Sequence, residues 1–243
     1  VRTDSNYSDL VLALPLVGSA NDVSNQINSG STTKVATLNG DPTASSTQSN
    51  FYGGSFEFDS DDYLSFADSD DFNLVSSGTG DFTIEFYVYL PDVSARYVLS
   101  SGTDATRVYI NSSTRLHLNN PTDSFLMESS TAAAAITANR WIHIAFCKSS
   151  STGYIFVDGV QYSFHSGPAL GGDLNFNDLR VGRTATSLNG HIQDLRVYKG
   201  VAKYTENFIP ASTNPDILPD TPSGVSYGSQ LAKVPAADGG SVG

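Results

Sequence analysis

Cysteine is almost absent from this sequence: Cys147 is the one thiol in 243 residues. A single thiol excludes an internal disulfide framework and a multi-cysteine zinc site. Cys147 lies within an apolar run, where a small buried side chain is far more common than a nucleophile. A chain of this length can bury roughly 70–75% of the surface that its unfolded form exposes. We therefore expect a core that needs no disulfide, with Cys147 inside it.

Basic residues are also scarce. Lys and Arg total 13 against 25 Asp and Glu, which gives a formal net charge of −12. Nucleic-acid binding requires a basic face that neutralises phosphates, so this balance argues against it. The four histidines stand singly, without metal-ligand spacing, which favours structural roles. An acidic chain rich in Ser, Thr, Asn and Gly is typical of exposed virion or extracellular β-proteins, and it favours recruitment of a divalent cation.

Long apolar runs are missing as well. No stretch approaches the roughly 20 residues that a membrane-spanning helix needs, so we predict no membrane insertion. The chain starts at Val1 without methionine. It also shows no signal peptide. These features favour a fragment or a processed product of a longer protein.

The pattern that is present is alternation. Along residues 82–90, apolar and polar side chains alternate with the period of a half-buried strand. Residues 141–148, 154–157 and 160–164 are further strand-like runs, and Asp158-Gly159 between the last two favours a tight hairpin turn. Three strands joined by short turns form a meander, and so apolar a meander must pack against another layer. The sequence predicts an all-β fold with one sheet packed on another.

Short strands recur along most of the chain, and about a dozen at this spacing indicate a sandwich or a barrel. From Pro210 onward the composition turns to Pro, Ser, Gly, Asp and Asn, which is typical of an extended tail or linker. We predict one domain over residues 1–209 and an extension over 210–243. Residues 131–138 are interpreted as a loop. The remaining predicted strands are 10–16, 35–38, 54–59, 63–66, 97–100, 107–110, 115–118, 174–181 and 191–198.

One tetrad, Asp-Leu-Arg-Val, occurs twice, at residues 178–181 and 194–197. The 16-residue spacing suits successive antiparallel strands joined near Asn189-Gly190. Local sheet structure therefore explains the repeat better than an internal duplication.

Five ordered motifs resemble a known family. The last is Gly190-His-Ile-Gln-Asp-Leu-Arg-Val-Tyr-Lys-Gly-Val-Ala-Lys-Tyr-Thr-Glu-Asn-Phe. It is similar to the closing strand of laminin-G-like, concanavalin-A-like lectin/glucanase domains. The other four are Gly54-Ser-Phe-Glu-Phe-Asp with Asp62-Tyr-Leu, Gly80-Asp-Phe-Thr-Ile-Glu-Phe-Tyr-Val-Tyr, Trp141-Ile-His-Ile-Ala, and Phe156-Val-Asp-Gly-Val.

The resemblance covers about residues 8–210 and is strongest to the variant found in virion proteins of tailed, cyanophage-like bacteriophages and in large bacterial surface proteins. It implies a jelly-roll sandwich of two antiparallel sheets. It also implies a binding or structural module more often than an enzyme.

An acidic motif offers the nearest approach to catalysis. A period of two places Glu57, Asp59 and Asp61 on one strand face. Glucanases that share the resembled fold carry their acids in this way, with nucleophile and acid/base about 5 Å apart. The last acid here is aspartate rather than glutamate, and the strand is expected to end at Asp61. The preferred interpretation is a core strand entering a turn, with no catalytic residue.

Calcium is the cofactor that the resemblance favours, because hard cations bind clustered carboxylate and carbonyl oxygens. The positions that match the family's metal site are Asp22, Asn25 and Asp194. Gln193 replaces the usual first acid of the closing motif, and the Asp22 loop lacks the usual Gly-Asn. The alternative interpretation is that the acids are solvated turn formers and strand caps. Alternative cages would use Asp59, Asp61 and Asp62, or Asp68, Asp70 and Asp71.

We expect a non-enzymatic module on the exterior of a virion, on a phage tail or a capsid, or on another extracellular surface, that binds host-surface glycan. Tyr87, Tyr89 and Tyr109 could stack against sugars, although packing explains such rings more often. One alternative is a purely structural virion protein, whose residues beyond 210 bind a neighbouring protein and which forms homo-oligomers in the particle. The other is a glycan hydrolase that uses Glu57 and Asp61.

Overall fold

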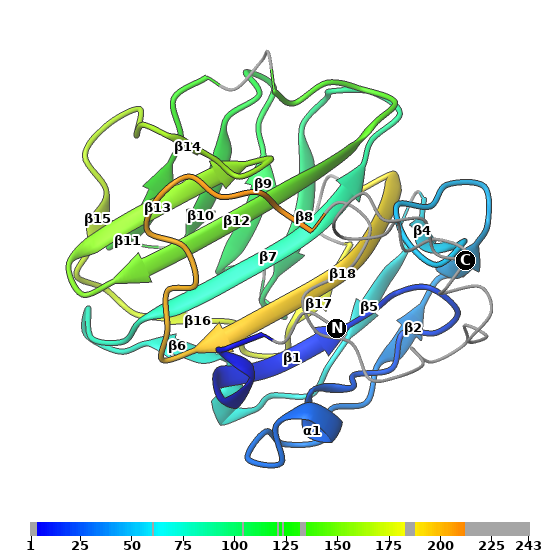
Figure 1. Cartoon of the computed structure of the whole chain (residues 1–243), viewed down its shortest axis with the longest axis horizontal. Helices are drawn as coiled ribbons and strands as arrows, with labels where there is room; N and C mark the ends of the chain where they lie inside the picture. Colours follow the sequence, from blue (N-terminus) through cyan, green and yellow to red (C-terminus); the bar gives the residue numbers. More distant parts are fainter. Residues whose placement is uncertain are drawn as a thin grey trace, which may run out of the picture.

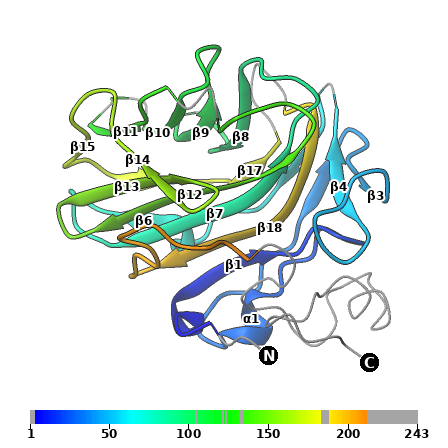
Figure 2. The same cartoon turned by 45° about the horizontal axis from the view of Figure 1, so that its top comes forward.

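The alternating segment 82–90 forms strand β7 (Phe82–Tyr89) in the computed structural model, near the middle of an antiparallel sheet (Figure 1). The structure describes residues 4–211 except 60, 104, 121, 123, 132–134 and 183–187. Two eight-stranded antiparallel sheets pack face to face (Figure 2). The predicted all-β sandwich is confirmed.

The first sheet has the order β14–β13–β12–β7–β18–β4–β3, and β1 pairs with β18 beside this path. The predicted meander is present as β12, β13 and β14, with Ile144 opposite Phe86 on one side and Val157 on the other. The strands are β1 (Leu10–Leu14), β3 (Thr43–Ser45), β4 (Ser55–Phe58), β12 (Trp141–Ser149), β13 (Thr152–Val157), β14 (Val160–Tyr162) and β18 (Gly190–Lys199), together with β7.

The second sheet has the order β15–β11–β10–β9–β8–β17–β5–β2. Its strands are β2 (Thr37–Asn39), β5 (Tyr63–Ser65), β8 (Arg96–Ser100), β9 (Arg107–Ile110), β10 (Leu116–Asn119), β11 (Phe125–Glu128), β15 (Ala169–Leu170) and β17 (Arg180–Val181). A separate pair joins β6 (Asn73–Val75) to β16 (Leu174–Asn175).

Helical structure is slight. The elements are α1 (Ser24–Ile27) and the 3-10 turns η1 (Tyr7–Asp9) and η2 (Asp70–Phe72). Within the described part of the chain, none of them has the length and apolar character to cross a membrane.

The core lies between the two sheets. Inward side chains of β7 and β12, such as Phe86 and Ile144, are 0% exposed and belong to one cluster with Val108 and Leu118 of the second sheet. Complete burial of such a side chain stabilises the fold by about 1.5–3 kcal/mol. Alternation along β7 and β12 therefore determines which face of the first sheet meets the second.

Strand β18 organises the first sheet. It pairs with β7 on one side, while on the other its first residues pair with β4 and its later residues with β1. A bulge between Gln193 and Arg196 marks the change of partner, and Asp194 within it has a positive φ of 52°. A bulge bends a strand and redirects its side chains, so the closing motif is both a central strand and a corner.

Residues 200–211, which we call the crossing segment, run over the outer face of the first sheet (orange in Figure 1). The backbone amide of Lys203 donates to the Thr83 hydroxyl on β7, at 2.9 Å. The amide of Phe208 donates to the Gly159 carbonyl in the turn between β13 and β14, also at 2.9 Å. The segment is therefore bonded to two separate parts of the sheet.

Aromatic packing covers the same face. Tyr204 and Phe208 of the crossing segment stack on each other and pack edge-on against Phe156 of β13. Cys147 lies in this cluster with 0% exposure, and burial raises the pKa of its thiol to about 12. The expectation of a buried cysteine is met.

Some predicted segments take another form. Residues 174–181 divide into β16 and β17, which belong to different sheets, so the two Asp-Leu-Arg-Val tetrads are not on paired strands. Strands β3, β6, β11 and β15 have no counterpart among the predicted strands, because segments of two to four residues are too short to show a clear period. Most of the predicted extension lies outside the described residues, which end at 211.

The contact between the crossing segment and Gly159 can be tested by Gly159→Ala. Gly159 has a φ of +76°, and a Cβ there would overlap the Phe208 carbonyl oxygen. Gly53 has a φ of +79°, and a Cβ added there would meet no atom within 4 Å. Gly53→Ala is therefore the matched control for backbone strain. Strain costs each variant about 1–2 kcal/mol, and overpacking costs Gly159→Ala about 1–3 kcal/mol more. Urea unfolding measures both; equal losses would contradict the packing argument.

Candidate functional site

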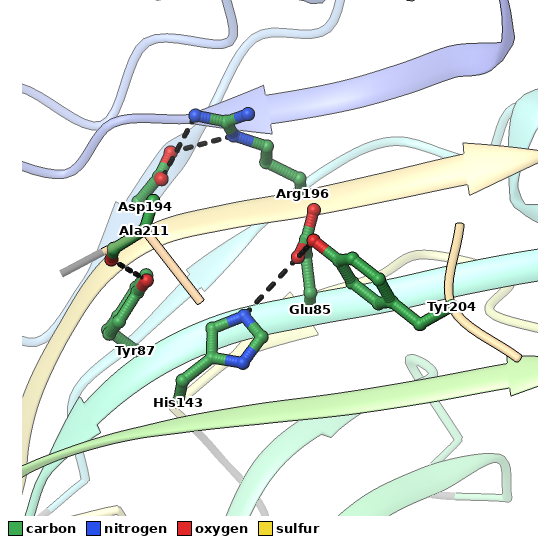
Figure 3. A pocket seen from close by; sticks show the side chains of 7 residues that line it. All are labelled: Glu85, Tyr87, His143, Asp194, Arg196, Tyr204 and Ala211. Atoms are coloured by element: carbon green, nitrogen blue, oxygen red, sulfur yellow. Dashed lines mark hydrogen bonds and ion pairs between the residues drawn. The ribbon is translucent and has the colours of Figure 1, made fainter. Parts of the chain in front are cut away.

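A cluster of buried charges lies between the first sheet and the crossing segment (Figure 3). Its centre is Glu85 of β7, which is 5% exposed. Glu85 accepts hydrogen bonds from Lys203 Nζ at 2.7 Å and from the Tyr204 hydroxyl at 2.9 Å. Its Oε2 also lies 3.2 Å from His143 Nε2. We call these four residues the Glu85 cluster.

The charges of the Glu85 cluster stabilise one another. Burial acts to raise the pKa of Glu85, but Lys203 and His143 outweigh it and hold this pKa well below its ordinary value. Burial acts in the opposite sense on Lys203, and the Glu85 carboxylate holds the pKa of that ammonium well above its ordinary value. Removing one partner of a buried pair leaves an uncompensated charge. The cluster therefore fastens the crossing segment to β7.

The space beside this cluster is too small for a ligand. The cavity in Figure 3 has a volume of about 10 Å³, and Ala211 of the crossing segment is one of the residues that line it. This is about the volume that one water needs. No sugar fits there, so the role of the cluster is structural.

Asp22 and Asn25 lie at the start of α1. Asp22 Oδ1 accepts hydrogen bonds from the backbone amides of Ala13 and Ser24, both at 2.9 Å, and its Oδ2 accepts one from the Ser24 hydroxyl. Burial raises the pKa of Asp22, against the effect of these donors and of Lys34. The Asn25 side chain donates to the Ser31 carbonyl. These bonds join α1 and its loop to β1.

Asp194 forms a buried bidentate pair with Arg196, with oxygen–nitrogen distances of 2.9 and 3.0 Å. A calcium cage needs several oxygens directed at the ion. The oxygens of Asp194 and Asp22 already accept from protein donors, so their present arrangement does not fit such a cage. Calcium binding by Asp22, Asn25 and Asp194 stays a prediction.

Gln193 explains one departure from the resembled motif. Its Oε1 accepts hydrogen bonds from the amides of Asn50 and Phe51, both at 3.0 Å, and its Nε2 donates to the Phe51 carbonyl at 2.8 Å. A carboxylate could not make the last bond, because it has no donor. An amide at this position holds the 50–51 loop against β18.

The expected placement of Glu57, Asp59 and Asp61 on one strand face is wrong. Strand β4 ends at Phe58, so both aspartates lie in the turn that follows. Glu57 is half-exposed, and its Oε1 lies 4.0 Å from His191 Nε2. The alternating acids of a glucanase strand are therefore not formed by these residues.

Three acids do converge beside that turn. One oxygen each of Asp41, Asp59 and Asp62 lies within 4.8 Å of the others. Asp62 is 3% exposed, and its oxygens accept hydrogen bonds from the amides of Asp41 at 2.8 Å and Asp59 at 3.1 Å. Two members of one alternative cage thus meet, with Asp41 in the place expected for Asp61.

The other alternative cage, Asp68, Asp70 and Asp71, is not among the acid groups that the described residues bring within metal-binding distance of one another. Asp71 Oδ2 lies 2.7 Å from Lys34 Nζ. Burial acts to raise the pKa of Asp71, but hydrogen bonds from Lys34 and Thr32 lower it below its ordinary value. Asp71 is thus a partner of the 32–34 loop.

The tyrosines considered for sugar stacking are engaged in packing. Tyr87 is 6% exposed, and its hydroxyl donates to the Ala211 carbonyl. Tyr109 lies between Tyr97 and His117, with ring centroids 4.9 and 4.4 Å away, so neighbouring rings cover both of its faces. Tyr89 packs beside Trp141 at 5.8 Å. Neither Tyr87 nor Tyr109 offers an open ring face to a ligand.

Two larger pockets open at the end of the sandwich where β8 and β10 end and β9 and β11 begin. The first, which we call the asparagine pocket, has a volume of about 360 Å³. Asn120 holds its wall, because its Nδ2 donates to the Asp173 carbonyl and its Oδ1 accepts from the Phe125 amide. Asn175 Oδ1 is buried without a hydrogen-bond partner among the described residues. The polar lining of the asparagine pocket includes Ser101, Thr106, Asn120, Asp173, Asn175 and Asn177.

The second, which we call the Lys148 pocket, has a volume of about 640 Å³. The amide of Ser77 donates to the Asp173 carboxylate, so the walls of the two pockets are joined. Asp81 Oδ1 accepts from the Ser150 amide at 2.7 Å. The sequence motifs did not indicate either pocket; the one available signal was a lysine on the inward side of strand 141–148. The lining of the Lys148 pocket includes Ser77, Thr79, Asp81, Lys148, Ser150 and Ser151.

The sequence profile of the concanavalin A-like lectin/glucanases superfamily matches residues 58–206, more than half of the chain. No curated protein sequence matches significantly.

Solved structures give the same fold. The binding domain of paraclostridial mosquitocidal protein 1 is similar with a TM-score of 0.63 and 11% identity, over 82% of this chain and 50% of that one. Domain 4 of an extracellular arabinanase from Geobacillus stearothermophilus, solved with arabinotriose, gives 0.54 and 14%, over 80% and 94%. The botulinum neurotoxin DC binding domain, solved with rat synaptotagmin II, gives 0.58 and 11%, over 80% and 49%. The chain thus spans about half the length of both toxin domains, and such identities establish the fold alone.

Glu85→Gln will destabilise the fold through the Glu85 cluster. The variant leaves Lys203 buried without its counter-charge, so we expect a loss of about 3 kcal/mol at pH 7. Glu57→Gln, on a half-exposed side chain, is the control, with an expected change of about 0.5 kcal/mol or less. Chemical unfolding measures both variants. Similar stabilities of Glu85→Gln and Glu57→Gln would contradict a structural role for this pair.

The same variant has a pH signature. Because the folded-state pKa of Glu85 lies below its unfolded value of 4.5, its contribution is complete above about pH 4.5 and is lost as pH falls toward the folded-state pKa. The stability gap between wild type and Glu85→Gln should therefore narrow between pH 4.5 and pH 2.5. A constant gap over this range would contradict the assignment.

The calcium prediction can be tested by calorimetric titration of chelator-treated protein with calcium chloride. The sequence-based prediction expects binding that Asp194→Asn abolishes and Asp41→Asn leaves intact. The reverse dependence would move the metal to the Asp41, Asp59 and Asp62 group. Absence of heat in the wild type would remove calcium from both.

Proposed function

Because this chain belongs to the concanavalin A-like lectin/glucanases superfamily, we propose that it is a non-enzymatic module that binds carbohydrate. The similar solved structures include two toxin binding domains and a domain solved with arabinotriose. These names support a binding role by analogy. The argument for carbohydrate rests on the chemistry of the pockets at the end of the sandwich.

The observation that carries the proposal is the lining of the asparagine pocket. Carboxamide side chains offer both donors and an acceptor, and hydroxyl groups can act as either, which matches the hydroxyls of a sugar. Asn177 is exposed at the pocket, and no hydrogen bond of its side chain is formed among the described residues. Asn175 Oδ1 is buried without a partner, an arrangement that needs a reason in a folded protein. A sugar hydroxyl donating to this oxygen would provide one.

A binding role is favoured over hydrolysis. A retaining hydrolase holds two carboxyl groups about 5–5.5 Å apart across the scissile bond. Glu57 lies on β4 whereas Asp61 lies beyond the strand end, in the turn that Asp62 closes. The acids suggested by the sequence therefore lack the shared strand face that such a pair requires.

We place the module on the exterior of a virion, on a tail or capsid, with host-surface glycan as its ligand. Support for this setting comes from the sequence motifs that resemble phage virion proteins and from the acidic, lysine-poor composition. A structural decoration role in the same particle is the competing function.

The proposal is tested with the full chain on a panel of neutral and acidic bacterial surface oligosaccharides. We expect reversible binding without release of reducing ends. Asn177→Ala should weaken it at least about tenfold, because its amide contacts would be lost. Asn50→Ala, on a half-exposed asparagine in the loop held against β18, is the matched control and should leave binding unchanged.

If a folded wild-type chain binds no member of the panel, the carbohydrate proposal is contradicted and the structural role is favoured. Release of reducing ends that Glu57→Gln stops would instead favour hydrolysis.

A further inference from the structure

We propose that the Lys148 pocket binds the anionic group of an acidic sugar residue, a carboxylate or a sulfate ester, while the rest of that residue occupies the hydroxyl-lined part of the pocket. This inference rests on the proposed carbohydrate binding and specifies its chemical class. It starts from a charged side chain at a position where the fold calls for an apolar one.

Lys148 continues the inward series of β12. Ile142, Ile144 and Phe146 precede it at intervals of two and are each 0% exposed in the core. Lys148 is 1% exposed, and it lies opposite Phe82 on β7. Lysine is almost never fully buried unless it is paired. Strand β12 therefore carries an ammonium group into the mouth of the sandwich.

Few groups of the protein offset the cost of burying the Lys148 ammonium. Lys148 Nζ donates to the Gly80 carbonyl at 2.8 Å. Among the residues that the structure describes, no carboxylate lies within ion-pair distance of it, whereas buried Lys34 and Lys203 each have two. A buried charge is costly unless it is paired and hydrogen-bonded. An anion entering the pocket would provide the missing partner.

The rim of the pocket suits a sugar. The hydroxyls of Ser77, Thr79, Ser150 and Ser151 belong to exposed residues and form no hydrogen bond with any described residue. They are therefore available to a ligand as donors or acceptors. A volume of about 640 Å³ is far larger than a simple ion requires and lies within the range of pockets for small organic ligands, about 300–1,000 Å³.

Asp81 sets the orientation. Its carboxylate lines the same pocket, and one of its oxygens accepts a hydrogen bond from the Ser150 amide. A carboxylate repels an anion but accepts hydrogen bonds from sugar hydroxyls. The acidic group of the ligand thus lies toward Lys148 and its hydroxyls toward Asp81. The two side chains together favour an acidic sugar over a bare anion or a neutral sugar.

The test compares acidic trisaccharides with a neutral ester. Trigalacturonic acid and its methyl ester share their hydroxyls, and a sulfated galactan trisaccharide separates sulfate from carboxylate recognition. We expect the wild-type chain to bind one of the two acidic probes at least about tenfold more tightly than the methyl ester, as charge-assisted hydrogen bonds predict. Titration calorimetry with the full chain gives each affinity.

Two variants locate the effect. Lys148→Met keeps an unbranched side chain at the position and should reduce the ratio of acidic to neutral affinity to about one. Ser151→Asp places a negative charge at the exposed rim, where folding tolerates it, and should also abolish the preference. Ser46→Asp, on an exposed residue after β3 at the edge of the first sheet, has the same net charge change and should leave the preference intact.

The outcomes separate this inference from the proposed function. Equal affinity for the acid forms and the methyl ester, lost in Asn177→Ala, would overturn the inference and leave carbohydrate binding in place. A preference for acid that survives both Lys148→Met and Ser151→Asp would assign the anion to another site and overturn it as well. Absence of binding by any sugar would overturn both proposals.

Discussion

A carboxylate buried on a central strand imposes the main constraint on this molecule. Glu85 lies on β7 beneath the crossing segment, where an unpaired charge would cost several kcal/mol. Lys203 and Tyr204 meet it from the chain beyond β18, and His143 meets it from β12. These contacts hold the crossing segment over the outer face of the first sheet, together with the stacked rings on Phe156. The face that a lectin-like sandwich could offer as a broad surface is thus occupied by the chain itself, and the space that remains is about the size of one water.

With that face covered, two large open pockets of the described chain lie at the strand ends. Loops carried by a rigid sandwich are common places for binding sites, because the sheets fix their spacing while their sequences are free to vary. The asparagine pocket and the Lys148 pocket share the wall around Asp173, yet their chemistry differs. One presents carboxamides and hydroxyls; the other adds a cation at its base. A single oligosaccharide with neutral and acidic residues would find complementary groups in both.

The sequence was a good guide wherever period and turn chemistry decide structure. Alternation identified β7 and β12, and Asp158-Gly159 identified the hairpin between β13 and β14, with positive φ at both residues. It was a poor guide to the candidate sites. In the sequence the acids after Phe58 continue the period of a strand. In the structure strand β4 ends at Phe58, and Asp62 closes a turn instead. The pocket residues come from separate loops such as 77–81 and 150–151, and their convergence depends on sheet packing that no local pattern encodes.

The repeated tetrad Asp-Leu-Arg-Val shows what the local sequence specifies and what depends on tertiary packing. In both copies the aspartate has a left-handed backbone, with φ of 51° at Asp178 and 52° at Asp194, and the leucine and valine are buried. The arginines diverge: Arg180 is half-exposed over the Tyr63 ring in the second sheet, whereas Arg196 is 2% exposed and paired with Asp194 in the first. The longer strands, the Asp158-Gly159 turn and the apolar core follow from the sequence, because period and turn chemistry depend on residues close together in the chain. Which charges are buried and which pockets open depends on the packing of the sheets, because the groups that surround each charge come from distant segments.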